Sequence, residues 1–363
     1  MKRALAALAL LLAGPAVAQG GAEQATAAAD AAARERVTRA ITGGGFAGVY
    51  AVYAGPRRIA GGSVGEAAPG QGGFDYQVAW PWASVTKQVI ATLIMQEVED
   101  GRIALDAPAS RYLPRLTGGA TVRQLLQHRA GLPNPETTAK DAEGVPAFYT
   151  AAQYDGAAGL DWCLTARSAP GAAWAYNNCD YIVLGALLQQ VTRTALPALF
   201  AQRIAAPLGL TAGFIAPLAN TPDARWPGGP TDAERAQIAR YGAAGALVGT
   251  PVDLITFDRA LLSGALLTGE ARAEMWRGDP ALGFMGLGQS SFTAPLAGCA
   301  KPVRIVERRG AIGRFAVRNA ILPDLGISVA LFTNRGDPDT GGFGEVWQGK
   351  GVTHDVLAAA ACP

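Results

Sequence analysis

Apolar and polar positions alternate with the period of β-strands mainly near the two ends of the chain. Near the N-terminus, residues 46–54 and 58–66 alternate like the arms of a hairpin, with Gly55-Pro56 at the turn. Near the C-terminus, the same alternation predicts three further strands, at residues 302–307, 315–322 and 326–332.

The middle of the chain has the apolar period of α-helices. Residues 84–98 are periodic, and Thr121 is placed to cap a helix over 122–128. Thr250-Pro251 opens another helix, in which Asp253 completes a capping box. Further helices fit residues 180–192, 196–204 and 269–276.

This order of elements predicts an α+β fold. One antiparallel sheet is formed by both chain termini, and helices at 30–41 and 353–361 flank it. Residues 28–80 and 300–363 then form an α/β part, into which residues 81–299 are inserted as a large, mostly helical part. We expect a cleft where the two parts meet.

Composition supports a buried core and argues against nucleic acid as a partner. Of the 363 residues, 50% are hydrophobic and 17% charged, which excludes wholesale disorder. The net charge is only +2, and no long basic run is present, whereas nucleic-acid binding needs clustered positive charge. We therefore expect a small-molecule or peptide substrate, and a monomer.

The N-terminus reads as an export signal. Met1-Lys2-Arg3 is followed by an apolar run over residues 4–13 and by the small residues Ala16-Val17-Ala18. This pattern predicts a signal peptide over residues 1–18, followed by a disordered segment at 19–27. The apolar run is too short to span a bilayer, and no later segment is apolar enough to do so.

The four cysteines fit an oxidising compartment. They allow three pairings, of which we favour Cys163–Cys179, closing a short loop, and Cys299–Cys362, holding the last helix. They show no CxxC spacing, and the chain has only two histidines, so we expect no metal and no cofactor.

A candidate nucleophile and base lie at the start of the helix predicted from residue 84. Ser84 and Lys87 are three residues apart, so they share one helix face. A serine needs a neighbouring base, and lysine can serve only when it is neutral, which requires desolvation or nearby positive charge. From the pair alone, a serine cap beside a surface lysine is the more common explanation.

A Tyr-x-Asn turn supplies two more candidates. Tyr176 and Asn178 can project a phenol and an amide to the same side of a cleft. Near positive charge the phenol can ionise and act as a base or shuttle, and the amide can bind both Lys87 and a substrate carbonyl. A buried tyrosine and a turn asparagine explain the same residues.

The third candidate segment lies at the end of a terminal strand. Gly310 would let a ligand approach the backbone of an edge strand, and the N–H of Ala311 could pair with that of Ser84 as an oxyanion hole. A glycine-rich hairpin with the solvated arginines Arg308 and Arg309 is the structural alternative.

These three motifs resemble, in order, the signatures of penicillin-recognising serine hydrolases. They are Ser-Val-Thr-Lys at 84–87, Tyr-Asn-Asn at 176–178 and Arg-Arg-Gly at 308–310. Supporting segments lie at 125–133, 244–254 and 331–334, so the likeness spans about residues 35–360. The chain is similar to the branch with class C β-lactamases, D-alanyl-D-alanine carboxypeptidases and esterases of that fold.

The resemblance implies an exported acyl-enzyme hydrolase of the bacterial periplasm. Ser84 would attack, Lys87 and Tyr176 would move protons, and Asn178 and Arg308 would hold the substrate. The substrate would be a peptidoglycan-type D-Ala peptide, a carboxylic ester or a β-lactam.

The third motif departs from the family's usual Lys-Thr-Gly. Arg308 keeps the charge but cannot act as a base, and its planar fork would suit a substrate carboxylate. Arg309 replaces a small residue and could narrow the cleft, which motivates an alternative: a catalytically impaired sensor or binding protein. A Ser-His-Asp triad is a weaker competitor, because no GxSxG elbow is present and His128 and His354 read as structural.

Overall fold

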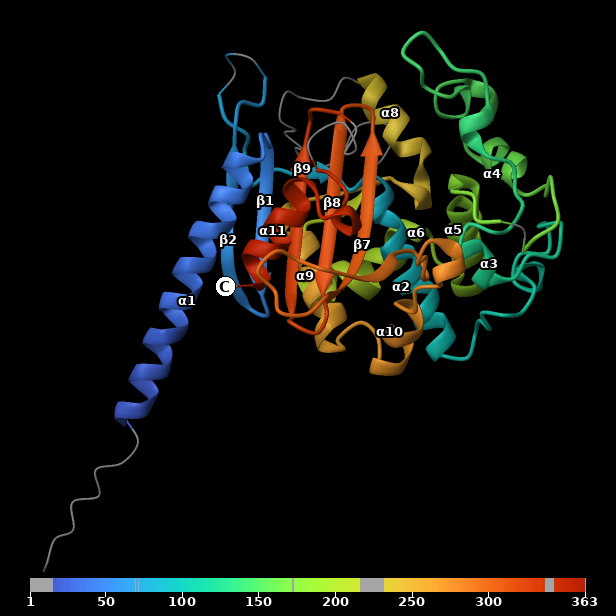
Figure 1. Ribbon diagram of the computed structural model, residues 1–363. Coiled ribbons are helices and arrows are strands. Elements are labelled where there is room, and N and C mark those ends of the chain that lie inside the picture. The colour runs from blue at the N-terminus through green and yellow to red at the C-terminus, as the bar shows by residue number, and fades with distance from the viewer. Residues whose placement is uncertain are drawn as a thin grey trace, which may run out of the picture.

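The computed structural model describes residues 16–362, apart from Pro69, Gln71, Ala172, 216–231 and 337–342 (Figure 1). The expected signal peptide at 1–18 lies largely outside this range, and its cleavage stays a prediction. Residues 19–27, expected to be disordered, belong to helix α1 (Ala16–Gly43). The alanines and glutamines of this segment have high helix propensity, which our interpretation underweighted.

Both ends of the chain contribute strands to one antiparallel sheet, as the alternation predicts. Six strands lie in the order β2-β1-β9-β8-β7-β6, and β1 joins the C-terminal strands by pairing with β9. Their bounds are β1 (Gly48–Ala54), β2 (Arg57–Val64), β6 (Ser290–Ala294), β7 (Val303–Ile312), β8 (Phe315–Leu322) and β9 (Ile327–Thr333).

Strands β6 and β7 differ from the expectation. The C-terminal part of the sheet begins at Ser290 rather than near residue 300, because β6 pairs with the first half of β7. The strand expected at 302–307 continues to Ile312, so the Arg-Arg-Gly motif lies inside β7 and not at its end. Since β6 covers only 303–307, the second half of β7 has an open edge.

Helices α1 and α11 (Gly351–Ala361) cover one face of the sheet (Figure 1). Val37 and Ile41 of α1 and Val356 of α11 are fully buried in a core cluster with strand residues of that face. The apolar sides of these two helices, which the sequence predicts to flank the sheet, close this second core.

The helical part of the chain packs on the other face and builds the larger core. Helices α2 (Thr86–Glu99) and α9 (Pro251–Ser263) lie in it, and α9 contacts β1 and β9. The predicted capping box at Thr250 and Asp253 is present. The remaining helices are α3 (Val122–Leu126), α4 (Ala157–Cys163), α5 (Asn178–Thr192), α6 (Leu196–Phe200), α7 (Ala206–Leu208), α8 (Asp232–Arg240) and α10 (Gly269–Met275).

Three short strands form a second sheet at the junction of the two parts. In the order β3-β5-β4 they are β3 (Trp80–Pro81), β5 (Leu247–Gly249) and β4 (Gly213–Phe214). Strand β5 pairs with β3 just before the segment that carries Ser84. Residues 247–249 are thereby held next to the start of α2.

Two helices differ from the prediction. Helix α3 begins with the capping box that Thr121 predicts, but it ends at Leu126, and His128 has a left-handed backbone with φ of 58°. The helix expected over 196–204 passes into a π-helical turn at Ala201–Ala205.

Both favoured disulfides are confirmed. Cys163 at the end of α4 is bonded to Cys179 in the first turn of α5, with their Cα atoms 5.2 Å apart. Cys299 is bonded to Cys362, directly after α11. The first disulfide fixes the segment next to the Tyr-x-Asn motif, and the second holds the last helix.

Over the described ranges, no single helix has the length and apolar character needed to cross a membrane. Helix α5 and the stretch Leu196–Leu208 meet the criterion only when taken together, and they are bent by 76° relative to each other.

Candidate active site

Ser84 lies on a tight turn at the N-terminus of α2. It belongs to the 3₁₀ turn Ala83–Val85, and Ala83 has a positive φ of 45°. A left-handed alanine is strained, and such strain persists only where the surrounding structure enforces it. Here Trp82 N–H donates to Leu247 O at 2.8 Å, so the short sheet holds the turn in place.

Lys87 is fully buried one helical turn after Ser84 and meets three oxygen atoms. Its Nζ lies 3.0 Å from Ser84 Oγ, 2.7 Å from Asn178 Oδ1 and 2.7 Å from Ala244 O. The last two atoms are carbonyl oxygens, which can only accept. They therefore take both hydrogens of a neutral amine, and the nitrogen lone pair is left facing the Ser84 hydroxyl.

The surroundings of Lys87 favour this neutral form. Burial, followed by the charge of Arg308, lowers the pKa of the Lys87 amine well below its usual value, although Asp180 and Glu136 oppose the shift. Desolvation disfavours the charged ammonium, and the guanidinium repels it. Lys87 thus meets both conditions under which a lysine can act as a base.

Tyr176 lies on the other side of Ser84. Its hydroxyl is 2.5 Å from Ser84 Oγ and accepts from Arg308 at 3.4 Å. Burial raises the pKa of the phenol, and the neighbouring Arg308 and Ser84 lower it only in part. We expected positive charge to ionise this phenol; in the resting site desolvation outweighs that effect, and Tyr176 keeps its proton.

Asn178 lies next to Lys87 because Asn177 caps α5. Asn177 Oδ1 accepts from Cys179 N–H at 2.9 Å, which puts Asn178 in the first helical turn directly after Tyr176. Asn178 Oδ1 accepts a hydrogen bond from Lys87 Nζ, and Asn178 Nδ2 donates to Tyr149 OH at 2.7 Å. The amide orients Lys87 and is itself oriented by Tyr149.

Arg308 binds groups of the protein itself. Its Nε donates to Ser84 O at 3.0 Å and a terminal nitrogen donates to the Tyr176 hydroxyl, and the side chain is buried. We expected the guanidinium to present its fork to a substrate carboxylate, but these two bonds already engage it. Its position suits an electrostatic and orienting role.

Arg309 points to the opposite face of the sheet. Successive side chains of a strand alternate between faces, so Arg309 lies opposite to Arg308. Its guanidinium is bonded to Glu307 and to Glu345. The expectation that Arg309 could narrow the cleft is therefore wrong.

Gly310 is required by the close approach of β7 to the Ser84 turn. A Cβ at this position would lie 2.7 Å from Trp82 O and 2.8 Å from Ser84 N, closer than side-chain carbons approach such atoms. Only glycine fits without movement of the strand or the turn.

The register of β7 directs the N–H of Ala311 to the open edge. Ile312 pairs with Phe315 across a two-residue turn. Opposite residues in an antiparallel ladder alternate between bonded and non-bonded pairs, and such a turn closes on a bonded pair. Ala311 therefore turns its N–H away from β8. The Ser84 N–H, in the first turn of a helix, likewise has no intrahelical acceptor.

His128 does not complete a serine triad. Its buried Nδ1 accepts from Asn177 N–H at 3.3 Å and lies 3.3 Å from Asp180 Oδ2. Burial lowers the pKa of His128 and raises that of Asp180, because desolvation disfavours the charged form of each group. The imidazole packs on the Tyr176 ring with centroids 4.7 Å apart, which supports the position of the phenol.

Sequence reasoning missed several groups around the nucleophile. They are the carbonyl of Ala244, the stacked rings of Tyr149 and Tyr241, and the carboxylate of Glu136 within 3.5 Å of Asn178 Nδ2. Ala244 lies in a segment singled out by the resemblance, but a backbone carbonyl leaves no mark in the residue pattern. The other three come from loops or segment ends without periodicity.

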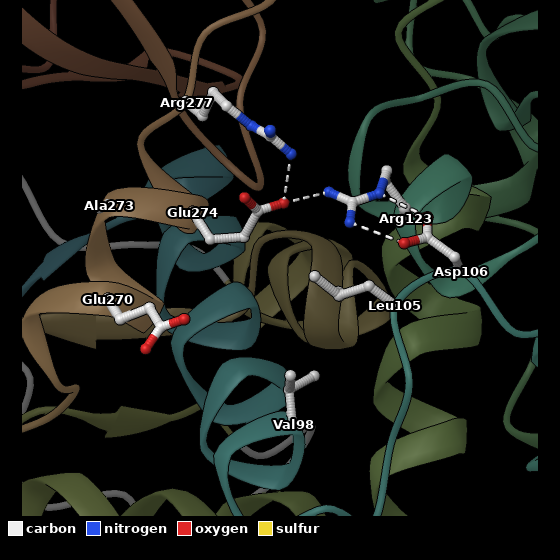
Figure 2. Close-up of a pocket in the computed structure, with 8 residues that line it drawn as sticks. All are labelled: Val98, Leu105, Asp106, Arg123, Glu270, Ala273, Glu274 and Arg277. Carbon is white, nitrogen blue, oxygen red and sulfur yellow. Dashed lines mark hydrogen bonds and ion pairs between the residues drawn. The ribbon is translucent and has the colours of Figure 1, made fainter.

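A cavity of about 550 Å³ lies away from these residues, near the far end of α2 (Figure 2). Four of its five charged side chains are paired with one another, since Arg123 binds Asp106 and Glu274, and Glu274 also binds Arg277. Val98 at this cavity is twelve residues beyond the start of α2, which is about 18 Å along a helix. Among the described residues, no group of three or more His, Cys, Asp or Glu is placed to hold a metal ion.

Comparison with known proteins finds a family and several relatives to which the chain is similar. A profile of the family described as Beta-lactamase matches residues 25–347. The D-aminopeptidase of Cereibacter sphaeroides is 30% identical over 131 residues, which are 36% of this chain and 25% of that protein. The esterase EstB of Burkholderia gladioli is 32% identical over 148 residues, covering 37% of this chain and 38% of that protein. The matches thus span well under half the length of these curated relatives.

Solved structures show similarity along nearly the whole chain. The D-stereospecific amidohydrolase from Streptomyces sp. superposes with a TM-score of 0.68 at 25% identity, covering 92% of this chain and 98% of that one. The fold is therefore the one expected from the three motifs.

Proposed function

The chain belongs to the beta-lactamase family, and on that premise we propose that it is an exported serine hydrolase that cleaves an amide or ester through an acyl-enzyme. One observation carries the proposal: the buried Lys87 Nζ lies 3.0 Å from Ser84 Oγ and 2.7 Å from each of two carbonyl oxygens, those of Asn178 and Ala244. The two disulfides fit an oxidising compartment such as the bacterial periplasm.

Acylation begins with transfer of the Ser84 proton to Lys87, 3.0 Å away. The oxygen attacks the substrate carbonyl, and the N–H groups of Ser84 and Ala311 stabilise the oxyanion. Tyr176 gives its phenolic proton to the leaving nitrogen or oxygen as the bond to the acyl carbon breaks. The resulting phenolate is stabilised by Arg308 and by the new Lys87 ammonium.

Deacylation restores the resting protonation state of each group. The Tyr176 phenolate takes a proton from water, and the hydroxide attacks the acyl carbon. Ser84 leaves with the proton held by Lys87, which becomes neutral again. Because Tyr176 is protonated in the resting site, it acts first as an acid and then as a base, whereas Lys87 does the reverse.

Relatives named as an aminopeptidase, an esterase and an amidohydrolase support an amide or ester substrate. The alternative of a catalytically impaired binding protein rested on Arg309, which lies on the far face of the sheet.

The test is hydrolysis of p-nitrophenyl butyrate, D-alanine p-nitroanilide and a chromogenic cephalosporin. We expect turnover of the ester or the anilide, a loss of at least about 10³-fold in Ser84→Ala, and no change in Ser63→Ala, whose serine is exposed on β2. Absence of Ser84-dependent turnover of all three substrates would refute the proposal.

A further inference from the structure

Trp174 is an exposed tryptophan beside the candidate active site. It is 43% exposed, and the other large hydrophobic residues that face solvent in the described part of the chain are Val252, Phe284, Leu325 and Trp347. A single exposed apolar side chain needs no explanation by itself. Trp174 differs from the other four in its position, because it lies two residues before Tyr176.

The backbone around Trp174 is bonded to a neighbouring segment on both sides. Ala175 N–H donates to His128 O at 3.1 Å, and Gly171 N–H donates to Arg129 O at 2.9 Å. The guanidinium of Arg129 donates in turn to Gly171 O at 2.6 Å. The indole is therefore held in place before any ligand binds, and little conformational freedom would be lost on binding.

The Trp174 indole and the Tyr176 phenol contact the same imidazole. The Trp174 ring lies edge-on to His128 with centroids 6.3 Å apart, and the Tyr176 ring lies on it with centroids 4.7 Å apart. The centroids of the two outer rings are thus at most about 11 Å apart, which three residues of extended chain can span. An aromatic surface open to solvent therefore lies within reach of the proton donor.

The proposed acylation step places the leaving group at Tyr176. The phenol gives its proton to the leaving nitrogen or oxygen, so that atom must lie about 3 Å from the Tyr176 hydroxyl. The acyl carbon is held at Ser84 Oγ, and its oxygen faces the N–H groups of Ser84 and Ala311. The part of the substrate that starts at Tyr176 is therefore the leaving group, and Trp174 is the exposed aromatic residue two positions away.

We propose that Trp174 binds an aromatic or large apolar leaving group, so that it determines specificity for the part of the substrate that is released first. This rests on the proposed function and narrows the class of leaving group. The indole offers a flat apolar surface without charge, so it attracts by stacking and by burial of apolar area. A small leaving group gains little from it.

The test compares Trp174→Ala and Trp174→Phe with the wild type on three esters. p-Nitrophenyl butyrate has an aromatic leaving group, vinyl butyrate has the same acyl group with a small leaving group, and vinyl phenylacetate carries its ring in the acyl group. In Trp174→Ala, kcat/KM should fall at least about tenfold for p-nitrophenyl butyrate and less than threefold for both vinyl esters. Trp174→Phe keeps a ring and should retain at least about a third of the wild-type value on p-nitrophenyl butyrate.

Trp347→Ala is the matched control. Trp347 is 60% exposed in the 3₁₀ turn Val346–Gln348, and its Nε1 donates to Glu345, the partner of Arg309 on the far face of the sheet. This variant should keep kcat/KM within twofold of the wild type on all three esters.

Three results would overturn the assignment. An equal loss on all three esters would show that Trp174 acts by holding His128 and Tyr176 in place. A loss on vinyl phenylacetate as large as that on the p-nitrophenyl ester would put the indole on the acyl side, and no loss on the p-nitrophenyl ester would show that the leaving group does not touch it. All three leave Ser84-dependent hydrolysis intact, whereas failure of the proposed function removes it for every substrate, so the two failures are distinguishable.

Discussion

Replacement of Gly310 by alanine tests the contact between β7 and the nucleophile turn. The added Cβ would lie 2.7 Å from Trp82 O, whereas ordinary contacts begin at 3.4 Å, so strand and turn must separate by about 0.7 Å. Displacement of a reacting group by about 1 Å costs on the order of 10²-fold in rate. We therefore expect kcat/KM to fall about 10- to 100-fold, and the free energy of unfolding to fall by about 1–3 kcal/mol.

The matched control is Gly62→Ala in strand β2. A Cβ there meets nothing within 4 Å, and the backbone is not left-handed. This variant should keep wild-type kcat/KM and be unchanged or slightly more stable, because alanine restricts the unfolded chain.

The assay is p-nitrophenyl ester hydrolysis together with thermal unfolding of all three proteins. Full activity and an unchanged melting temperature in Gly310→Ala would refute the claim that β7 positions the Ser84 turn. Equal losses in Gly310→Ala and Gly62→Ala would refute it as well, because the effect would then not depend on the contact.

Three further predictions concern charge and covalent links. Burial lowers the Lys87 pKa in the folded state. In the pH range between this lowered pKa and the ordinary pKa of lysine, the unfolded chain therefore binds one more proton than the folded chain. Chemical denaturation should therefore show the free energy of unfolding of the wild type rising with pH in this window, and a Lys87→Met variant should lack this rise. Arg308→Lys should lower kcat/KM about tenfold, whereas Arg309→Lys should lower the melting temperature with less than a twofold change in kcat/KM. Replacing both Cys163 and Cys179 by alanine removes a crosslink over a separation of 16 residues, which should cost about 3 kcal/mol in urea unfolding.

The elements best predicted from the sequence are those with long, regular periods. Strands β8 and β9 alternate clearly, and the chemistry of Thr250-Pro251 marks the start of α9. Strand β6 was not predicted from the sequence, because three of its five residues carry hydroxyl groups and the strand is only partly buried. Its apolar and polar positions therefore show no clear alternation. The two- and three-residue strands beside Ser84 are too short to show any period.

The residues that lie together at the candidate site were easier to predict from the sequence than their charge states. The helical spacing of Ser84 and Lys87 fixes their contact, but whether Tyr176 is ionised depends on how deeply it is buried. The role of Arg309 depended on the length of β7: once the strand is known to reach Ile312, alternation alone puts this side chain on the far face.

The most direct measurement is the mass of the enzyme quenched in acid during turnover of a p-nitrophenyl ester. The account predicts one acyl group per chain, on the peptide that contains Ser84, accumulating further in Tyr176→Phe because deacylation loses its base. An acyl group on another residue, or an adduct that persists in Ser84→Ala, would contradict it.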